Sequence, residues 1–347
     1  MATATTTQGK TASPSVDVGE IKGKSLWQKL KEGKIAYFYI APAAIVMAVI
    51  TLYPMLFQIW MSFTTYSTRN LRATFGDIFT NTPPAPDYTF NNYTDIFGGL
   101  TKYGVTNYDF WRLLTFNVVW AFSNVIFHVA IGVIVAMVLN RKKLVGRRLY
   151  RSLFLIPWAM PPFVVALVWR NMFNTQFGAI NQLFGVQIPW LESNAPDPIP
   201  FLSLLPLSYF ALLITNVWLG WPFMSVVATG ALQSVSQELY EAADMDGASR
   251  WQRFWNVTVP SIRPAMVPAV MLGLIWTFNQ FNVIYFVSQG GPYGRTEILV
   301  TQAYKFVSEK RLYGLASAFS IIVFFILLVI TLITNRITKA TEGANED

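Results

Sequence analysis

Few residues in this chain could do chemistry, and one short segment holds a cluster of acidic residues. The 347 residues include a single histidine, His128, and no cysteine. Disulfides and thiol catalysis are therefore excluded, and the usual metal-ligand and acid–base sets are missing. Four of the 18 acidic residues lie in QELYEAADMDGASRWQRFWNVTVP, residues 237–260: Glu238, Glu241, Asp244 and Asp246. Long uncharged runs flank this segment on both sides.

The segment carries the signals of two short helices joined by a turn. Ser236 is placed to cap the first helix, and Gly247 can adopt the left-handed conformation that ends it. Ser249 and Gln252 have the spacing of a capping box, which starts a second helix. Pro260 is expected to mark the end of that helix. We therefore predict a helical hairpin.

One side of the predicted hairpin is made of small residues. Ala242, Ala243 and Gly247 fall on neighbouring turns, which permits another surface to approach the backbone closely. Acidic side chains such as Glu241 and Asp246 can pair with basic groups of a partner. The residues alone leave two interpretations open, a solvated hairpin that lies on a bilayer or a docking element for a soluble protein.

The rest of the chain has the composition of a membrane protein. It is 53% hydrophobic and 13% charged, whereas a soluble domain has roughly 25% charged residues. A helix of about 20 apolar residues crosses a bilayer, and one charge at mid-bilayer costs about 3 kcal/mol. Six uncharged runs predict six transmembrane helices, at about 36–63, 113–140, 152–172, 206–231, 265–289 and 313–335.

Prolines make two of these helices irregular. Pro42 and Pro54 predict a bend in the first helix. The third helix contains Pro157, Pro161 and Pro162, which remove backbone donors. Because such a break is tolerated in a membrane only against protein or water, we expect the third helix to pack inside the protein and to act as a hinge.

The distribution of Lys and Arg predicts the orientation. Of the 26 such residues, 17 lie in four segments on one side of the predicted bilayer: 1–35, 141–151, 232–263 and 336–347. The positive-inside rule places both termini and the polar hairpin in the cytoplasm. We divide the chain into a mostly disordered tail (1–35), a membrane domain (36–335) with an outer loop (64–110), and a second tail (336–347). The net charge of +8 reflects this topology, and we expect no nucleic-acid partner.

The hairpin resembles the EAA loop of the permeases of ABC importers. That pattern is EAA, three residues, Gly, nine residues and Ile-x-Leu-Pro, and this chain has Glu241-Ala242-Ala243, Gly247, Val257, Val259 and Pro260. The resemblance implies the type I importer permease fold, with residues 232–263 as the coupling loop. It also implies that this loop inserts into a separate ATP-binding subunit, so the chain itself binds no cofactor and ATP is used by the partner. The coupling residues are then Glu241, Ala242, Ala243, Asp246, Gly247 and Pro260.

Other stretches are similar to the maltose-type (MalF-like) permeases of sugar importers. They are YRSLFLIPWAMPPF, FNTQFGAINQLFG, NVWLGWPFM, FNQFNVIYFVSQGGP and TEILVTQAYKF, within residues 110–335. The resemblance implies a bacterial inner-membrane protein that carries maltose, maltodextrin or a related oligosaccharide. It further implies a second, MalG-like permease, a MalK-like ATP-binding dimer and an extracytoplasmic sugar-binding protein as partners.

Sugars present hydroxyl groups and flat C–H faces, so a sugar path needs amides and aromatic rings. The candidates are Asn216, Gly220 and Phe223 on the fourth helix and Trp276, Thr277, Asn279 and Gln280 on the fifth. Asn117, Asn124 and His128 form a similar stripe on the second helix. Polar residues in a bundle also hold helices together, and this reading stays open for each residue. For the fourth and fifth helices, the resemblance favours the path.

Two other classes of function fit these residues less well. An ion-coupled secondary sugar transporter normally keeps ionisable residues within its helices, whereas here only His128 lies well within a predicted span. A membrane enzyme would need an acid–base or metal set, which these spans lack.

Overall fold

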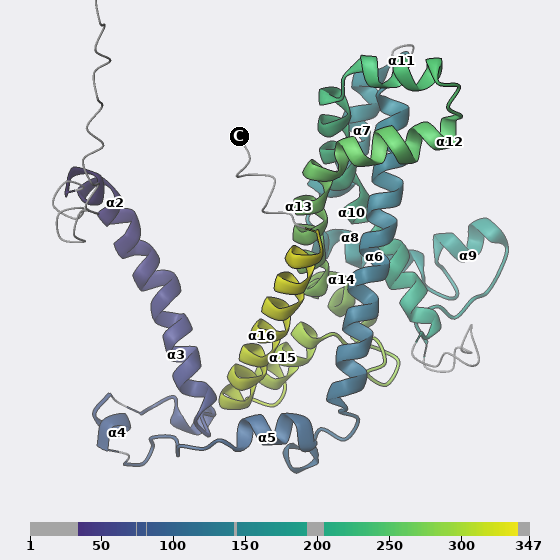
Figure 1. Cartoon of the computed structure of the whole chain (residues 1–347). Coiled ribbons are helices and arrows are strands. Elements are labelled where there is room, and N and C mark those ends of the chain that lie inside the picture. The colour runs from purple at the N-terminus through teal and green to yellow at the C-terminus, as the bar shows by residue number, and fades with distance from the viewer. Residues whose placement is uncertain (1–33, 74, 81, 142–143, 193–204, 339–347) are drawn as a thin grey trace, which may run out of the picture. The chain divides into compact units, whose positions relative to one another are not determined.

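The computed structural model describes residues 34–73, 75–80, 82–141, 144–192 and 205–338, and the secondary-structure elements in these ranges are all helices, joined by turns and loops (Figure 1). The predictions for the two tails, 1–35 and 336–347, fall almost wholly outside the described residues. The chain divides into two compact units, Met1–Phe57 and Gln58–Asp347.

The first unit holds an apolar helix with one irregular turn. It comprises α2 (Lys34–Met47), a π-helical turn η1 (Ala48–Leu52) and the start of α3 (Tyr53–Ser62). A proline ring in a helix clashes with the carbonyl four residues earlier. The wide turn of η1 lies just before Pro54 and gives that ring room. The predicted first helix is confirmed as a helix, with its irregularity at this turn.

The second unit is built on four long helices: α6 (Phe110–Leu139), α10 (Leu207–Ser234), α13 (Val259–Phe278) and α16 (Tyr313–Thr338). Buried side chains of α6, α10 and α13 form one apolar cluster, which includes Val133, Met224 and Met266. Where α6 meets α10, Gly132 lies directly against the backbone of Met224 and Ser225. Small residues of this kind let membrane helices approach closely.

The third predicted helix is broken, which corrects the expectation of one span over 152–172. The structure has α7 (Arg147–Ala159) and α8 (Pro162–Met172), bent by 90° relative to each other. Met160 at the break is extended, with φ −77° and ψ 143°. A residue before proline is pushed out of the helical region, and Pro161 and Pro162 offer no N–H to continue the helix. Within the described residues, five helices are long and apolar enough to cross a membrane, or six if this pair counts as one span.

The fifth helix begins earlier than predicted. The short helix α12 (Arg250–Arg253) runs through a π-helical turn η4 (Phe254–Thr258) directly into α13. The expectation that Pro260 ends the second hairpin helix is therefore wrong. Pro260 is the second residue of α13, and the wide turn before it removes the clash of its ring with the preceding helical turn.

The other end of α13 is interrupted, which was not predicted. The helix stops at Phe278, and Gln280, with φ −75° and ψ 75°, separates it from α14 (Phe281–Val283) and the π-helical turn η5 (Ile284–Ser288).

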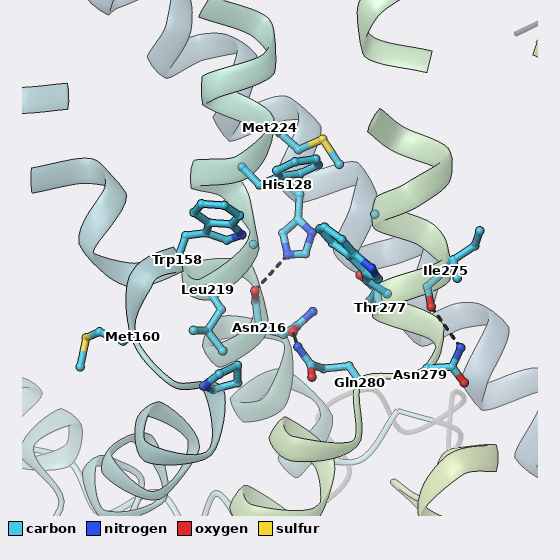
Figure 2. A pocket seen from close by; sticks show the side chains of 15 residues that line it. His128, Trp158, Met160, Asn216, Leu219, Met224, Ile275, Thr277, Asn279 and Gln280 are labelled. Carbon is cyan, nitrogen blue, oxygen red and sulfur yellow. Dashed lines mark hydrogen bonds between the residues drawn. The ribbon is translucent and has the colours of Figure 1, made fainter. Parts of the chain in front are cut away.

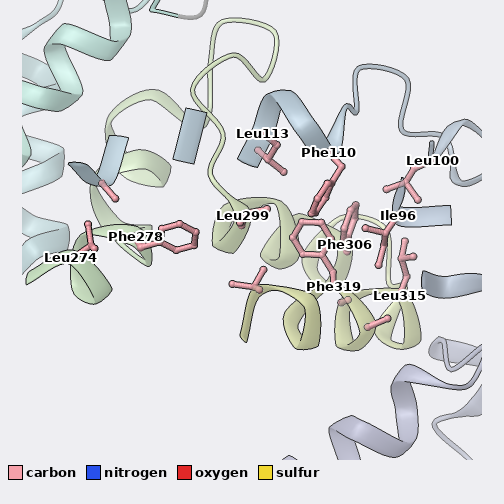
Figure 3. Packing of buried hydrophobic residues seen from close by; sticks show 14 of the residues in the cluster. Ile96, Leu100, Phe110, Leu113, Leu274, Phe278, Leu299, Phe306, Leu315 and Phe319 are labelled. Atoms are coloured by element: carbon pink, nitrogen blue, oxygen red, sulfur yellow. The ribbon is translucent and has the colours of Figure 1, made fainter. Parts of the chain in front are cut away.

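The segments predicted to lie on the outer side fold into short helices: α4 (Phe75–Thr80), α5 (Asn91–Gly98), α9 (Ala179–Phe184) and α15 (Leu299–Ser308). The loop over 64–110 therefore has the small substructure that its length predicted. Its Ile96 and Leu100 are fully buried and pack with Phe306 of α15 and Phe319 of α16 in one cluster (Figure 3).

The close approach of α6 and α10 predicts that Gly132→Ala destabilises the membrane domain. A Cβ atom there would lie 2.6 Å from Met224 Cβ and 2.8 Å from the Ser225 backbone N, which cannot swing away. We expect a cost of roughly 1–3 kcal/mol, seen as a lower melting temperature of the purified protein. Gly230→Ala on α10 is the matched control, because nothing lies within 4 Å of its added Cβ. A melting temperature of Gly132→Ala at or above that of Gly230→Ala would contradict this packing.

Candidate functional site: a preformed hairpin and a membrane cavity

The hairpin forms as its capping residues predicted. Ser236 Oγ accepts a 3.2 Å hydrogen bond from the Glu238 backbone N at the start of α11 (Gln237–Met245). Gly247 has φ +71°, the left-handed conformation expected after this helix. Ser249 and Gln252 exchange hydrogen bonds of 2.8 and 3.3 Å at the start of α12. These three predictions are confirmed.

Two side-chain contacts join the arms of the hairpin. The Tyr240 hydroxyl on α11 lies 3.1 Å from Thr258 Oγ1 in η4, and Asp244 on α11 forms an ion pair with Arg253 on α12. The ion pair is partly exposed, so it adds little stability. Its geometric effect is larger, because it fixes α11 against the helix that continues into α13. The hairpin is thus shaped before any partner binds.

The hairpin leaves its predicted contact residues open to solvent. Glu241, Ala242, Asp246 and Gly247 are exposed, Ala243 is half-buried, and Pro260 is exposed at the start of α13. Large apolar side chains are exposed beside them: Met245 is 88% and Trp251 69% exposed. A small polar hairpin that presents such side chains has a surface suited to contact with another protein.

A cavity of about 390 Å³ lies between α6, α10, α13 and the break between α7 and α8 (Figure 2). All seven residues predicted for a transport path are on its wall: Asn216, Gly220, Phe223, Trp276, Thr277, Asn279 and Gln280. The resemblance and the helical spacing thus select residues that the fold brings together. Among the described residues lining the cavity, none is Asp, Glu, Lys or Arg.

A chain of hydrogen bonds crosses the polar side of the cavity. His128 Nε2 donates to the backbone oxygen of Asn216 over 3.0 Å, since a carbonyl oxygen can only accept. The Asn216 side chain donates to Asn124 Oδ1 over 2.9 Å and accepts from Gln280 Nε2 over 3.3 Å. Gly220 makes room for the imidazole, because a Cβ there would lie 2.3 Å from His128 Cε1. The amides are thereby held in fixed orientations.

Aromatic rings form the other side of the cavity. Phe223 lies between two indoles, with ring centroids 6.1 Å from Trp158 and 5.4 Å from Trp276. Trp158 and Trp276 are 52% and 51% exposed, so their faces are open to a ligand. Fixed amides opposite open aromatic faces, with no formal charge, suit a neutral polyhydroxylated molecule.

The sequence missed the cavity residues of the broken span, and on α6 two of the three polar residues hold helices together, which is one of the two readings left open for them. Trp158, Met160 and Pro162 line the cavity, and the only signal for them was the proline-rich break itself. Asn117 and Asn124 do not line it. Asn117 is fully buried and joins three segments, donating to the Phe278 oxygen and accepting from the Leu299 backbone N. Of the stripe on α6, only His128 reaches the cavity.

Residues 128–343 match the family of the binding-protein-dependent transport system inner membrane component. This chain belongs to that family. The permease is therefore a multi-pass inner-membrane protein and a non-catalytic component of a binding-protein-dependent ABC importer, which implies a binding protein and an ATPase as partners. The predicted family is confirmed, and the alternative of an ion-coupled secondary transporter does not fit it.

Curated relatives cover nearly the whole permease. It is 31% identical over 332 residues to the galactooligosaccharides transport system permease protein GanP of Bacillus subtilis, covering 91% of this chain and 73% of that one. It is 30% identical over 311 residues to the trehalose/maltose transport system permease protein MalF of Thermococcus litoralis, covering 90% and 96%. The fold resembles that of a chain in the crystal structure of a bacterial ABC transporter that imports alginate, with a TM-score of 0.69, 19% identity, and coverage of 92% and 99%.

The bond between Asn124 and Asn216 predicts a non-additive effect on stability. Each single substitution, Asn124→Leu or Asn216→Leu, leaves the other buried amide without its partner. We expect each to lower the free energy of unfolding by about 1–3 kcal/mol. The double variant removes both amides, so it should cost less than the sum of the single changes, measured by thermal unfolding of the purified permease. Asn124→Leu with Asn279→Leu is the control pair and should be additive, because Asn279 bonds within its own helix to the Ile275 oxygen. Additivity in the first pair would contradict the assigned bond.

Proposed function

We propose that this permease is the transmembrane subunit of an ATP-driven importer for maltose, maltodextrin or a related oligosaccharide, and that the cavity is its part of the sugar path. The observation that carries the proposal is the uncharged cavity wall, which contains both the amides of Asn216, Asn279 and Gln280 and the half-exposed rings of Trp158 and Trp276. The oligosaccharide substrates in the names of GanP and MalF support the same class of substrate.

The proposed coupling site is the exposed hairpin from Glu241 to Gly247, together with Pro260 behind it. A MalK-like ATP-binding dimer would receive α11 in a cleft, where the small face of Ala242 and Ala243 allows close contact. The chain itself then needs no cofactor, because ATP is bound and hydrolysed by the partner. With six spans and both termini in the cytoplasm, as the positive-inside rule predicts, this hairpin would lie on the ATPase side of the membrane.

The remaining partners complete the path at its side and its outer end. A second, MalG-like permease would supply the opposite wall, facing the half-exposed rings of Trp158 and Trp276. An extracytoplasmic sugar-binding protein would deliver sugar at the outer segments, which include α5, α9 and α15. In this arrangement one permease contributes half of the path and one coupling hairpin.

Charge reversal on the hairpin should uncouple the permease from its ATPase. Gly247→Arg inserts a long side chain at a left-handed position, and Glu241→Lys inverts an exposed charge on α11. We expect each to lower both ATPase co-purification and ATP-driven uptake of radiolabelled maltodextrin by about tenfold or more, since interface residues of this kind cost 2 kcal/mol or above.

The matched control is Glu309→Lys, which makes the same exposed charge change after α15 in an outer segment. It should leave ATPase association unchanged. Undiminished association and uptake in Gly247→Arg and Glu241→Lys would contradict the docking role. Uptake that persists in vesicles with a proton gradient and no ATP would contradict the proposed energy source.

A further inference from the structure

A second cavity, of about 820 Å³, lies where α6 and α10 end and α7 begins. Arg147, Arg148 and Arg151 of α7 line it, opposite Asn140, Gln233 and Gln237. Two apolar candidate spans, α6 and α10, end beside it, so the cavity lies at the level where the hydrocarbon gives way to the polar interface. The described residues that line it include three guanidinium groups and no carboxylate.

Two of these arginines have guanidinium nitrogens that are poorly satisfied by the described residues. Among those residues, Nε of Arg147 and both Nε and Nη2 of Arg151 are buried without a hydrogen-bond partner. Arg147 Nη2 reaches Asn140 Oδ1 only at 3.5 Å, which is too long for a strong bond. Burying a charge is costly unless a counter-charge accompanies it. An anion in the cavity would supply that counter-charge.

The start of α7 adds to the positive field. Its N-cap residue is Gly146, which has φ +74° and no side chain that could accept hydrogen bonds from the first N–H groups of the helix. The positive end of the helix dipole therefore points toward the same region as the arginines. Phosphate oxygens fit both features, because guanidinium groups bind them with paired hydrogen bonds.

An apolar groove of about 230 Å³ adjoins this cavity and shares Arg151 with it. Its other lining residues include Leu139, Phe154, Leu155, Pro222 and Val226. On α10, Pro222 and Val226 lie several residues nearer the middle of the span than Gln233, so the groove extends from the arginines into the hydrocarbon region. The guanidinium group of Arg151 thus borders both the polar cavity and the apolar groove.

We propose that this composite site binds an anionic phospholipid, with its headgroup phosphate among Arg147, Arg148 and Arg151 and an acyl chain in the groove. Basic pockets between membrane helices recognise anionic headgroups in this way. The positive-inside pattern explains why arginines are present near the membrane surface. That rule does not require the arginines to converge on a cavity that adjoins an apolar groove. A phospholipid, by contrast, would place its headgroup in the cavity and an acyl chain in the groove.

The test is lipid binding to the full-length permease in detergent, followed by native mass spectrometry. Phosphatidylglycerol and phosphatidylcholine are titrated separately, with inorganic phosphate as a third probe. We expect phosphatidylglycerol to bind about tenfold more tightly than phosphatidylcholine or phosphate. The double substitution Arg147→Gln/Arg151→Gln should remove that preference. Arg141→Gln, an exposed arginine near the same cavity that does not line it, should keep it.

A second variant tests the groove with the arginines intact. Val226→Trp fills the slot and should weaken phosphatidylglycerol about tenfold while leaving phosphate binding unchanged. Equal binding of the two lipids by the unaltered permease would overturn the proposal. Full phosphatidylglycerol binding by the double arginine variant or by Val226→Trp would also overturn it. Phosphate that binds as tightly as phosphatidylglycerol, with no effect of Val226→Trp, would assign the site to a free anion and also overturn it.

Discussion

Inside a bilayer, every backbone N–H and C=O must find a partner within the protein or in a water-filled space, and this constraint organises the whole permease. The chain breaks its spanning helices at two points, at Met160–Pro162 between α7 and α8 and at Asn279–Gln280 after α13. Both breaks lie on the wall of the same cavity. Both breaks thus lie where a polar space can satisfy the freed backbone groups, and that place is also where a solute could pass.

The sequence predicted the features that depend on local chemistry. The caps at Ser236 and Ser249 and the left-handed Gly247 need only their neighbours, and they form as expected. The effect of a proline depends on the turn before it. Two adjacent prolines after an extended Met160 bend the third span by 90°. At Pro260, the wider π-helical turn that precedes it leaves room for the ring, and the helix continues. The spacing of polar residues in the sequence predicted that Asn216 and Gln280 would line the cavity. Trp158 lines it because the third span is broken, which the sequence did not predict.

The hairpin and the cavity are joined by a continuous stretch of helix. α12, η4 and α13 run without a break from Arg250 to Phe278, and Trp276 and Thr277 on the cavity wall lie at its far end. The ion pair of Asp244 with Arg253 fixes α11 to the near end of this stretch. In the proposed importer, a displacement of the hairpin by the ATPase would reach the sugar path through this helix, without the need for a flexible link.

If the cavity carries the sugar, a bound oligosaccharide shields the cavity wall, and site-directed thiol labelling measures that shielding. The chain has no cysteine, so Asn279→Cys on the cavity wall gives this subunit a single thiol, whose labelling is read from its own band after the assembled transporter is separated into subunits. Leu183→Cys on α9, which is 79% exposed, serves as the reference. We expect a transported oligosaccharide to slow maleimide labelling at position 279 and to leave the labelling rate at position 183 unchanged. Labelling at position 279 that is equally fast with and without sugar would contradict it.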